Sequence, residues 1–156
     1  MRVLRLLSGA SAAAGRGLLA GLAGTAAMTV SSTLEARIRG RGGSSAPADA
    51  AAVALGVHPE GEGGGRFSTL VHWGYGTGWG AVRGLVGWAG LSGTPATAAH
   101  LAAVWGGEQV VLPATGTSGP ATAWGVEEIA IDLLHHSVYA AATGVVYEAL
   151  DRAGPA

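Results

Sequence analysis

The sequence contains no cysteine and very few charged residues. Without cysteine, the chain has no disulfide bonds, no thiolate metal ligands and no cysteine nucleophile. Charged residues make up 12% of the 156 residues, about half of the roughly 25% found in soluble proteins. A soluble domain with so few charges would have difficulty covering its surface with hydrated groups. The composition therefore favours a membrane protein.

Lysine is absent as well, and all nine basic residues are arginines. Together with 28 glycines and abundant alanine, this usage is typical of a GC-rich bacterial genome. The formal net charge is -1, and no basic patch is present to attract a nucleic acid. We therefore predict a bacterial protein whose partner is the lipid bilayer and not DNA or RNA.

Four long stretches of the chain carry few or no charges. The first, residues 17–34, has no charge in 18 residues, which is about the length that crosses a hydrocarbon core of roughly 30 Å. We predict three further spans at residues 67–91, 96–112 and 126–150. A strand pattern is absent, and open sheet edges are not viable in lipid. The predicted fold class is all-α, a single integral membrane domain over residues 1–156 with about four transmembrane helices.

The segments outside these spans are polar or basic. Residues 39–66 read as a glycine-rich polar loop, with a short interfacial helix over residues 47–55 that begins at Pro47. Residues 1–16 fit either a signal peptide or a basic juxtamembrane tail, and we favour the tail because the apolar part before Ser8 is short. The arginines are divided equally between the two predicted membrane faces. The positive-inside rule therefore gives no orientation for this multi-pass plasma-membrane topology.

Glycines recur at every fourth position of the second predicted span. Small residues at this spacing form a flat strip along a helix, and helix backbones approach each other closely there. Drift in a glycine-rich genome is the alternative explanation. We predict that the strip packs helices together, either within one chain or against a second copy or another membrane protein. Its members are Gly74, Gly76, Gly78, Gly80 and Gly84.

Two of the predicted spans carry polar side chains at intervals of three and four residues, which places them on one helix face. A charged group at the bilayer centre costs roughly 2.5 to 3.5 kcal/mol on insertion scales, so we expect both stripes to face the bundle interior. The stripe of the second span is Ser68, His72, Tyr75, Trp79 and Arg83. The stripe of the fourth span is Glu128, Asp132, His136, Tyr139, Thr143 and Tyr147.

Helix rise places several of these polar groups at a similar depth. At about 1.5 Å per residue, His72 and Glu108 lie near the same membrane face, Asp132 is only slightly deeper, and His136 follows Asp132 by about one helical turn. We predict that these four side chains form one intramembrane polar cluster. Arg83 lies nearer the other face and reaches Glu108 only when its side chain is extended.

Several functions remain open for this cluster. The residues could pair to hold the helices in register, which is a structural or accessory role, or they could form a proton or ion pathway of a small transporter. A metal site using Asp132 with His135 or His136, together with Glu108, suits Fe, Mn or Zn, and haem held by two histidines is a further alternative. No serine has a nucleophile-elbow context, and glycines 61–65 lack the Lys-Ser/Thr of a phosphate loop. We predict no catalytic residues and no bound cofactor.

Short motifs recur in and beside the predicted spans. They are Gly21 and Gly24, His72 and Tyr75, Pro113 and Gly116, Glu127 and Glu128, His136 and Tyr139, and Tyr147 and Glu148. Together these motifs resemble the YagU-like family of small bacterial inner-membrane proteins. The resemblance covers most of the spans and none of the long loop. It implies a multi-span bacterial membrane protein of unassigned molecular function, and it carries no catalytic residues.

Overall fold

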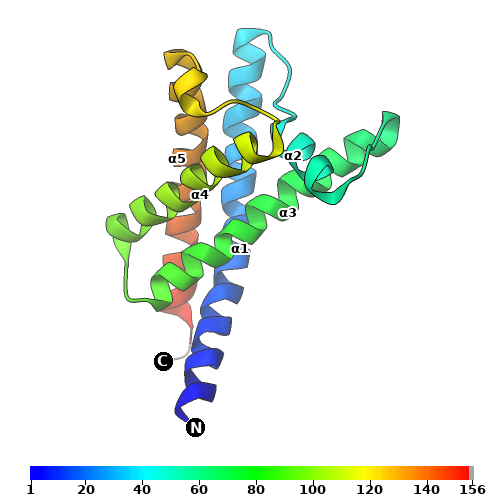
Figure 1. The fold of residues 1–156 in the computed structure, drawn as a ribbon. Helices are drawn as coiled ribbons and strands as arrows, with labels where there is room; N and C mark the ends of the chain where they lie inside the picture. The colour runs from blue at the N-terminus through cyan, green and yellow to red at the C-terminus, as the bar shows by residue number, and fades with distance from the viewer. Residues whose placement is uncertain (155–156) are drawn as a thin grey trace.

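The fold was analysed in a computed structural model, which describes residues 1–154. Within these residues the chain is all-α and contains no strand. Figure 1 shows the helices arranged around the long first helix. The helices are α1 (Arg2–Arg39), α2 (Ala46–Leu55), α3 (Gly61–Trp88), α4 (Gly93–Thr115) and α5 (Val126–Ala153), with a 3-10 turn at Ala121–Ala123.

Helix α1 is the centre of the assembly. It has 38 residues, which corresponds to a length of about 57 Å, and its most extensive contacts are with α3 and α5. In Figure 1, α5 runs antiparallel beside α1, whereas α3 crosses α1 obliquely. Helix α4 packs on α5 and α3, and the short α2 packs on α3 and α4.

Glycines bring α1 and α3 into backbone contact where they cross. A Cβ atom at Gly80 would overlap the carbonyl oxygen of Gly17 and the backbone of Gly21, and a Cβ atom at Gly84 would overlap the carbonyl oxygen of Ala13. Such a crossing exists only with very small residues, because any side chain would push the backbones apart. Gly17 and Gly21 therefore form the α1 half of a small-residue crossing with α3.

The five glycines of the α3 strip divide between two faces. Gly76 joins Gly80 and Gly84 on the face toward α1, where a Cβ atom at Gly76 would overlap the Thr25 hydroxyl. Gly74 and Gly78 point elsewhere, since no atom lies within 4 Å of their Cβ positions. Of the five glycines, only Gly76, Gly80 and Gly84 pack against α1. That Gly74 and Gly78 contact a second copy of the chain stays a prediction.

The helices extend beyond the predicted spans. Helix α1 begins at Arg2, so the basic N-terminal segment is continuous with the first predicted span. Helix α3 begins at Gly61, so residues 61–66 are helical although their glycines predicted a loop. The acidic Glu62 in the first turn of α3 favours this start because it complements the positive end of the helix dipole.

Helix α4 continues past the end of the predicted span 96–112. It ends at Thr115, and Gly116 then adopts the left-handed conformation that terminates helices (φ 68°). Pro113, two residues before the helix end, removes a single hydrogen bond, which the chain tolerates at this position. The predicted short helix with Pro47 near its start is present as α2.

Many large apolar side chains lie on the surface, and several large polar side chains lie inside. Apolar side chains are exposed along α1 and α5, among them Leu19 and Val145. The buried residues are mostly alanines and other apolar residues such as Leu112, but they also include polar and charged ones. In soluble proteins large apolar side chains are more often buried, and charged ones are almost always exposed. The largest fully buried side chains are Arg83, Tyr139, His100, Thr25 and Thr143.

Two helices of the described chain, α1 and α5, are long and apolar enough to cross a membrane. Only 28% and 33% of their most apolar windows are buried within the protein, which distinguishes them from the core helices of a soluble domain. Helices α3 and α4 fall below the same hydropathy threshold. Their many glycines, together with the tryptophans and polar groups of α3, lower the average.

Candidate functional site

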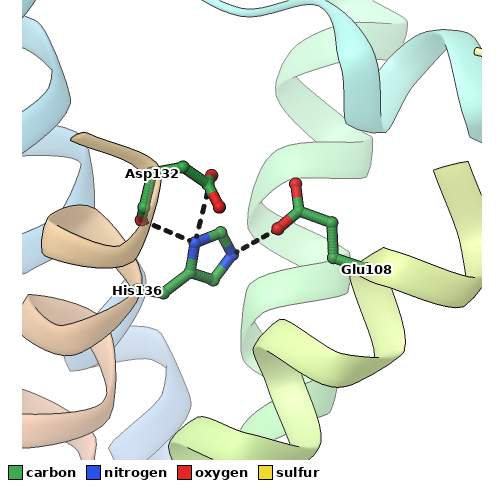
Figure 2. Close-up of side chains that lie close together, drawn as sticks. All are labelled: Glu108, Asp132 and His136. Atoms are coloured by element: carbon green, nitrogen blue, oxygen red, sulfur yellow. Dashed lines mark hydrogen bonds and ion pairs between the residues drawn. The ribbon is translucent and has the colours of Figure 1, made fainter. Parts of the chain in front are cut away.

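Three of the predicted cluster residues meet between α4 and α5. Asp132 and His136 lie one turn apart on α5, and Glu108 reaches them from α4 (Figure 2). One potential ligand atom from each residue lies within 4.8 Å of those of the other two. We call these three residues the carboxylate–imidazole cluster.

The contacts of His136 fix the orientation of its ring. The Nδ1 atom lies 2.9 Å from the backbone carbonyl oxygen of Asp132 and 3.3 Å from its Oδ1 atom. Because a carbonyl oxygen only accepts hydrogen bonds, Nδ1 carries the proton. The other ring nitrogen, Nε2, faces the Oε2 atom of Glu108 at 3.4 Å.

The surroundings support the Asp132 carboxylate and leave that of Glu108 partly unpaired. Trp105 donates from its indole Nε1 to Asp132 Oδ2 at 2.8 Å. The Oε2 atom of Glu108 is buried and accepts no hydrogen bond. The exposed fractions of the side chains are 12% for His136, 19% for Glu108 and 25% for Asp132. The cluster is therefore mostly enclosed but reachable by a small ion.

His72, the fourth predicted member of the cluster, binds a different partner. Its Nε2 atom lies 2.8 Å from the hydroxyl of Thr29 on α1. The depth estimate places residues along the membrane normal and carries no information about which neighbouring helix a side chain faces. Helix α3 turns His72 toward α1, away from the α4–α5 contact.

Arg83 forms a separate ion pair near the opposite end of the bundle. Its side chain is fully buried, and Nη2 donates to Glu148 Oε1 at 3.2 Å. The guanidinium also lies over the Tyr147 ring, 4.5 Å from its centroid, a cation–π arrangement. Glu148 in addition accepts the backbone N–H of Gly93 at the start of α4, so one carboxylate connects α3, α4 and α5.

Sequence analysis missed Glu148 as the partner of Arg83, and the predicted spans gave no signal for this pair. Arg83 stands eight residues before the end of the predicted span 67–91, whereas Glu148 stands two residues before the end of the predicted span 126–150. In the structure each residue stands five residues before the end of its helix, α3 or α5. The depth argument identifies the pair only with these helix ends.

His135 lies against α1, in a group distinct from the carboxylate–imidazole cluster. Its Nδ1 atom lies 2.8 Å from the Ser31 hydroxyl, and its Nε2 atom lies 3.5 Å from Glu35. Glu35 also pairs with Arg39 and Arg41. The structure thus directs His136, and not His135, toward Asp132 and Glu108.

Glu35 follows the first predicted span and belongs to the polar end of α1. The hydrogen bond from Arg41 lowers the pKa of the Glu35 carboxyl below its ordinary value, and the nearby charges of Arg41 and Arg39 act in the same direction. This carboxylate remains charged and anchors the chain where it leaves α1.

The remaining buried histidine, His100, is also engaged separately. Its Nε2 atom lies 3.0 Å from the backbone carbonyl oxygen of Trp79, and its ring lies 5.5 Å from that of Tyr139. His72, His100 and His135 therefore each bind a different partner. These contacts give no support to a haem held by two histidines.

Comparison with known proteins identifies no relative. No family model, no curated protein and no solved structure matches the chain. Its function is therefore inferred from the residues and contacts described above.

Proposed function

We propose that the protein is a multi-pass integral membrane protein of the bacterial plasma membrane, with α1, α3, α4 and α5 as its four spans. The observation that carries this proposal is the exposure of large apolar side chains together with the burial of large polar ones. Leucines and valines cover the outside of α1 and α5, whereas Arg83, His100 and Thr143 are fully buried. Lipid favours this arrangement because it solvates apolar groups and penalises unpaired polar ones.

Helix lengths are compatible with four crossings. Helix α3 has 28 residues and α4 has 23, which gives lengths of about 42 and 34 Å, enough for a hydrocarbon core of about 30 Å. Glycine and tryptophan lower the hydropathy of α3, yet glycine is frequent within transmembrane helices and tryptophan at their ends. Helix α2, with 10 residues, is too short to cross and suits the interface.

Within this bundle we assign the ion pairs a structural role, which makes the protein an accessory component of the envelope. Two of the pairs join different helices: Arg16 and Asp151 join α1 to α5 at 2.9 Å, and Arg83 and Glu148 join α3 to α5. Such pairs fix the register of helices whose apolar surfaces are equally well solvated by lipid. The resemblance to the YagU-like family implies a multi-span membrane protein and assigns no molecular role.

The absence of cysteine allows a direct test of the topology. Serines stand near the N-terminus (Ser8) and in or beside the three connections between the proposed spans (Ser44, Ser92 and Ser118). Four single Ser→Cys variants would be labelled in intact and disrupted cells with a maleimide that does not cross membranes. Four spans place positions 8 and 92 on one side of the membrane and positions 44 and 118 on the other.

A two-span topology, with only α1 and α5 inserted, gives a different pattern. Position 92 would then be labelled from the same side as positions 44 and 118. Extraction of the protein from membranes by alkaline carbonate without detergent would contradict membrane integration altogether.

Ion-linked transport is a second candidate function, and the contact among Glu108, Asp132 and His136 favours it. Intramembrane carboxylates and histidines in contact act as proton or ion relays in transporters. Purified protein in liposomes should then carry flux driven by a pH gradient. Glu108→Gln should abolish the flux, whereas His72→Gln, which changes a histidine bound elsewhere, should retain it. Flux that survives Glu108→Gln would exclude this cluster as the pathway.

A further inference from the structure

The geometry points to a binding site for one divalent transition-metal ion, formed by Glu108, Asp132 and His136. This inference goes beyond membrane insertion and does not depend on transport. Two oxygen ligands and one imidazole are the donor set that suits Zn²⁺, Mn²⁺ or Fe²⁺, and the chain contains no thiolate that would select a softer ion.

The first argument is the unpaired acceptor at the centre of the cluster. With its proton on Nδ1, which points to the Asp132 carbonyl oxygen, a neutral His136 presents a lone pair at Nε2. That lone pair faces the Oε2 atom of Glu108, which is buried and accepts no hydrogen bond. Two acceptors facing each other repel, and either a proton or a bound cation between them removes the repulsion. The pH and metal measurements of the test distinguish these two cases.

The second argument is distance. Zinc binds imidazole nitrogen and carboxylate oxygen at about 2.0 to 2.2 Å, so two ligands of a tetrahedral ion lie about 3.4 Å apart. The observed separation of His136 Nε2 and Glu108 Oε2 is 3.4 Å. Asp132, within the same 4.8 Å group, supplies the third ligand from a flexible side chain.

The third argument is the support around the ligands. Metal-binding histidines usually donate their other ring nitrogen to a carbonyl or carboxylate, which fixes the tautomer. His136 has this arrangement through the backbone carbonyl oxygen of Asp132, and the Trp105 indole donates to Oδ2 of the Asp132 carboxylate. Three protein ligands leave a coordination position for water or an anion.

Charge balance also favours a divalent ion. Two carboxylates with a neutral imidazole carry a charge of -2, which a divalent cation neutralises. In a low-dielectric bundle such neutralisation removes the cost of two adjacent carboxylates. The cluster lies within the first three turns of α5 and near the end of α4, where an ion from the aqueous phase reaches it over a short path.

The test is equilibrium metal binding to the full chain in detergent, purified without a histidine tag. Co²⁺ serves as the spectroscopic probe, and Zn²⁺ competes with it. We expect one Co²⁺ per chain, visible absorption bands from ligand-field transitions, and displacement by one Zn²⁺. Glu108→Gln and His136→Gln should each weaken binding by at least about tenfold, whereas Glu62→Gln and His72→Gln should leave it unchanged.

Thermal unfolding followed by circular dichroism provides a second readout. Zn²⁺ should raise the unfolding temperature of the unaltered chain and not that of folded Glu108→Gln. Absence of bound metal in the unaltered chain, or unchanged affinity in both cluster variants, would overturn the inference. Stability that responds to pH but not to metal would show that a proton, and not a metal ion, lies between Glu108 and His136. Because binding is measured in detergent, its failure is distinguishable from failure of the topology experiment.

Discussion

Among single residues, Arg83 places the strictest demand on its surroundings. Its guanidinium is fully buried, and its Nε and Nη1 atoms have no hydrogen-bond partner. The Glu148 carboxylate and the Tyr147 ring are therefore its principal sources of stabilisation. A buried charge that loses its partner is costly, because neither water nor another group replaces the lost interaction.

Glu148→Gln should consequently destabilise the folded protein. The variant keeps the side-chain shape and removes the charge opposite Arg83, which predicts a loss of about 1 to 3 kcal/mol in the free energy of unfolding. Unfolding in mixed detergent micelles would measure the loss. The exposed control Glu62→Gln should change the free energy by less than about 0.5 kcal/mol. Equal values for the two variants would argue against the Arg83 pair.

Glu35 predicts a pH dependence of stability with a definite sign. Its folded pKa lies below the ordinary value of 4.5 because of the hydrogen bond from Arg41. The corresponding stabilisation is therefore complete above pH 4.5 and decreases as the pH falls through the lower folded pKa. Arg39 and His135 also face this carboxylate.

Comparison with Glu35→Gln would isolate this contribution. The unaltered chain should be the more stable of the two at pH 7, and the difference should disappear as the pH is lowered well below the ordinary pKa of glutamate. Thermal unfolding of both proteins at a series of pH values measures this difference in stability. A difference that grows toward low pH would have the wrong sign for this ion pair.

At the scale of helices, the crossing of α1 and α3 decides how closely the bundle packs. Gly80→Ala would place a methyl group against the backbone of Gly17 and Gly21, and backbone has no alternative rotamer. We expect a loss of about 1 to 3 kcal/mol, the usual cost of overpacking. Gly78 is the matched control, because no atom lies within 4 Å of its Cβ position.

Gly78→Ala should be neutral or stabilise the helix by up to about 1 kcal/mol, the difference in helix propensity between glycine and alanine. Unfolding of both variants in the same detergent gives the comparison. If Gly78→Ala is as destabilising as Gly80→Ala, the Gly74 and Gly78 face is itself covered, and a second copy of the chain becomes its expected occupant.

The sequence pattern predicts where the helices lie along the chain, but not how they pack against one another. The long uncharged stretches located four helices, and helix rise placed Glu108 and Asp132 at similar depth, with His136 about one helical turn beyond Asp132. Periodicity does not encode which helices are neighbours, and His72 therefore faces Thr29 of α1 instead of joining the cluster. Residues 61–66 are helical because α3 extends through glycines that, taken alone, favour a loop.

For the whole molecule, the exposed apolar side chains predict aggregation in the absence of detergent. Exposed apolar side chains along α1, including Leu18, Leu19 and Leu22, need a covering of lipid or detergent. We expect the purified protein to aggregate when detergent is diluted away, as size-exclusion chromatography would show. A monodisperse species without detergent would contradict the proposed membrane location.

The central place of α1 also sets an order of events during synthesis. It precedes the other described helices along the chain, yet its small-residue face packs on α3 and α5, and α5 ends more than 110 residues later. At about 5 to 20 residues per second, roughly 6 to 23 s pass between the synthesis of α1 and that of the end of α5. During that interval Gly24 and Thr25, which later pack against α5 and α3, face lipid or an insertion factor. Nascent chains stalled before α5 should therefore crosslink to such a factor through this face.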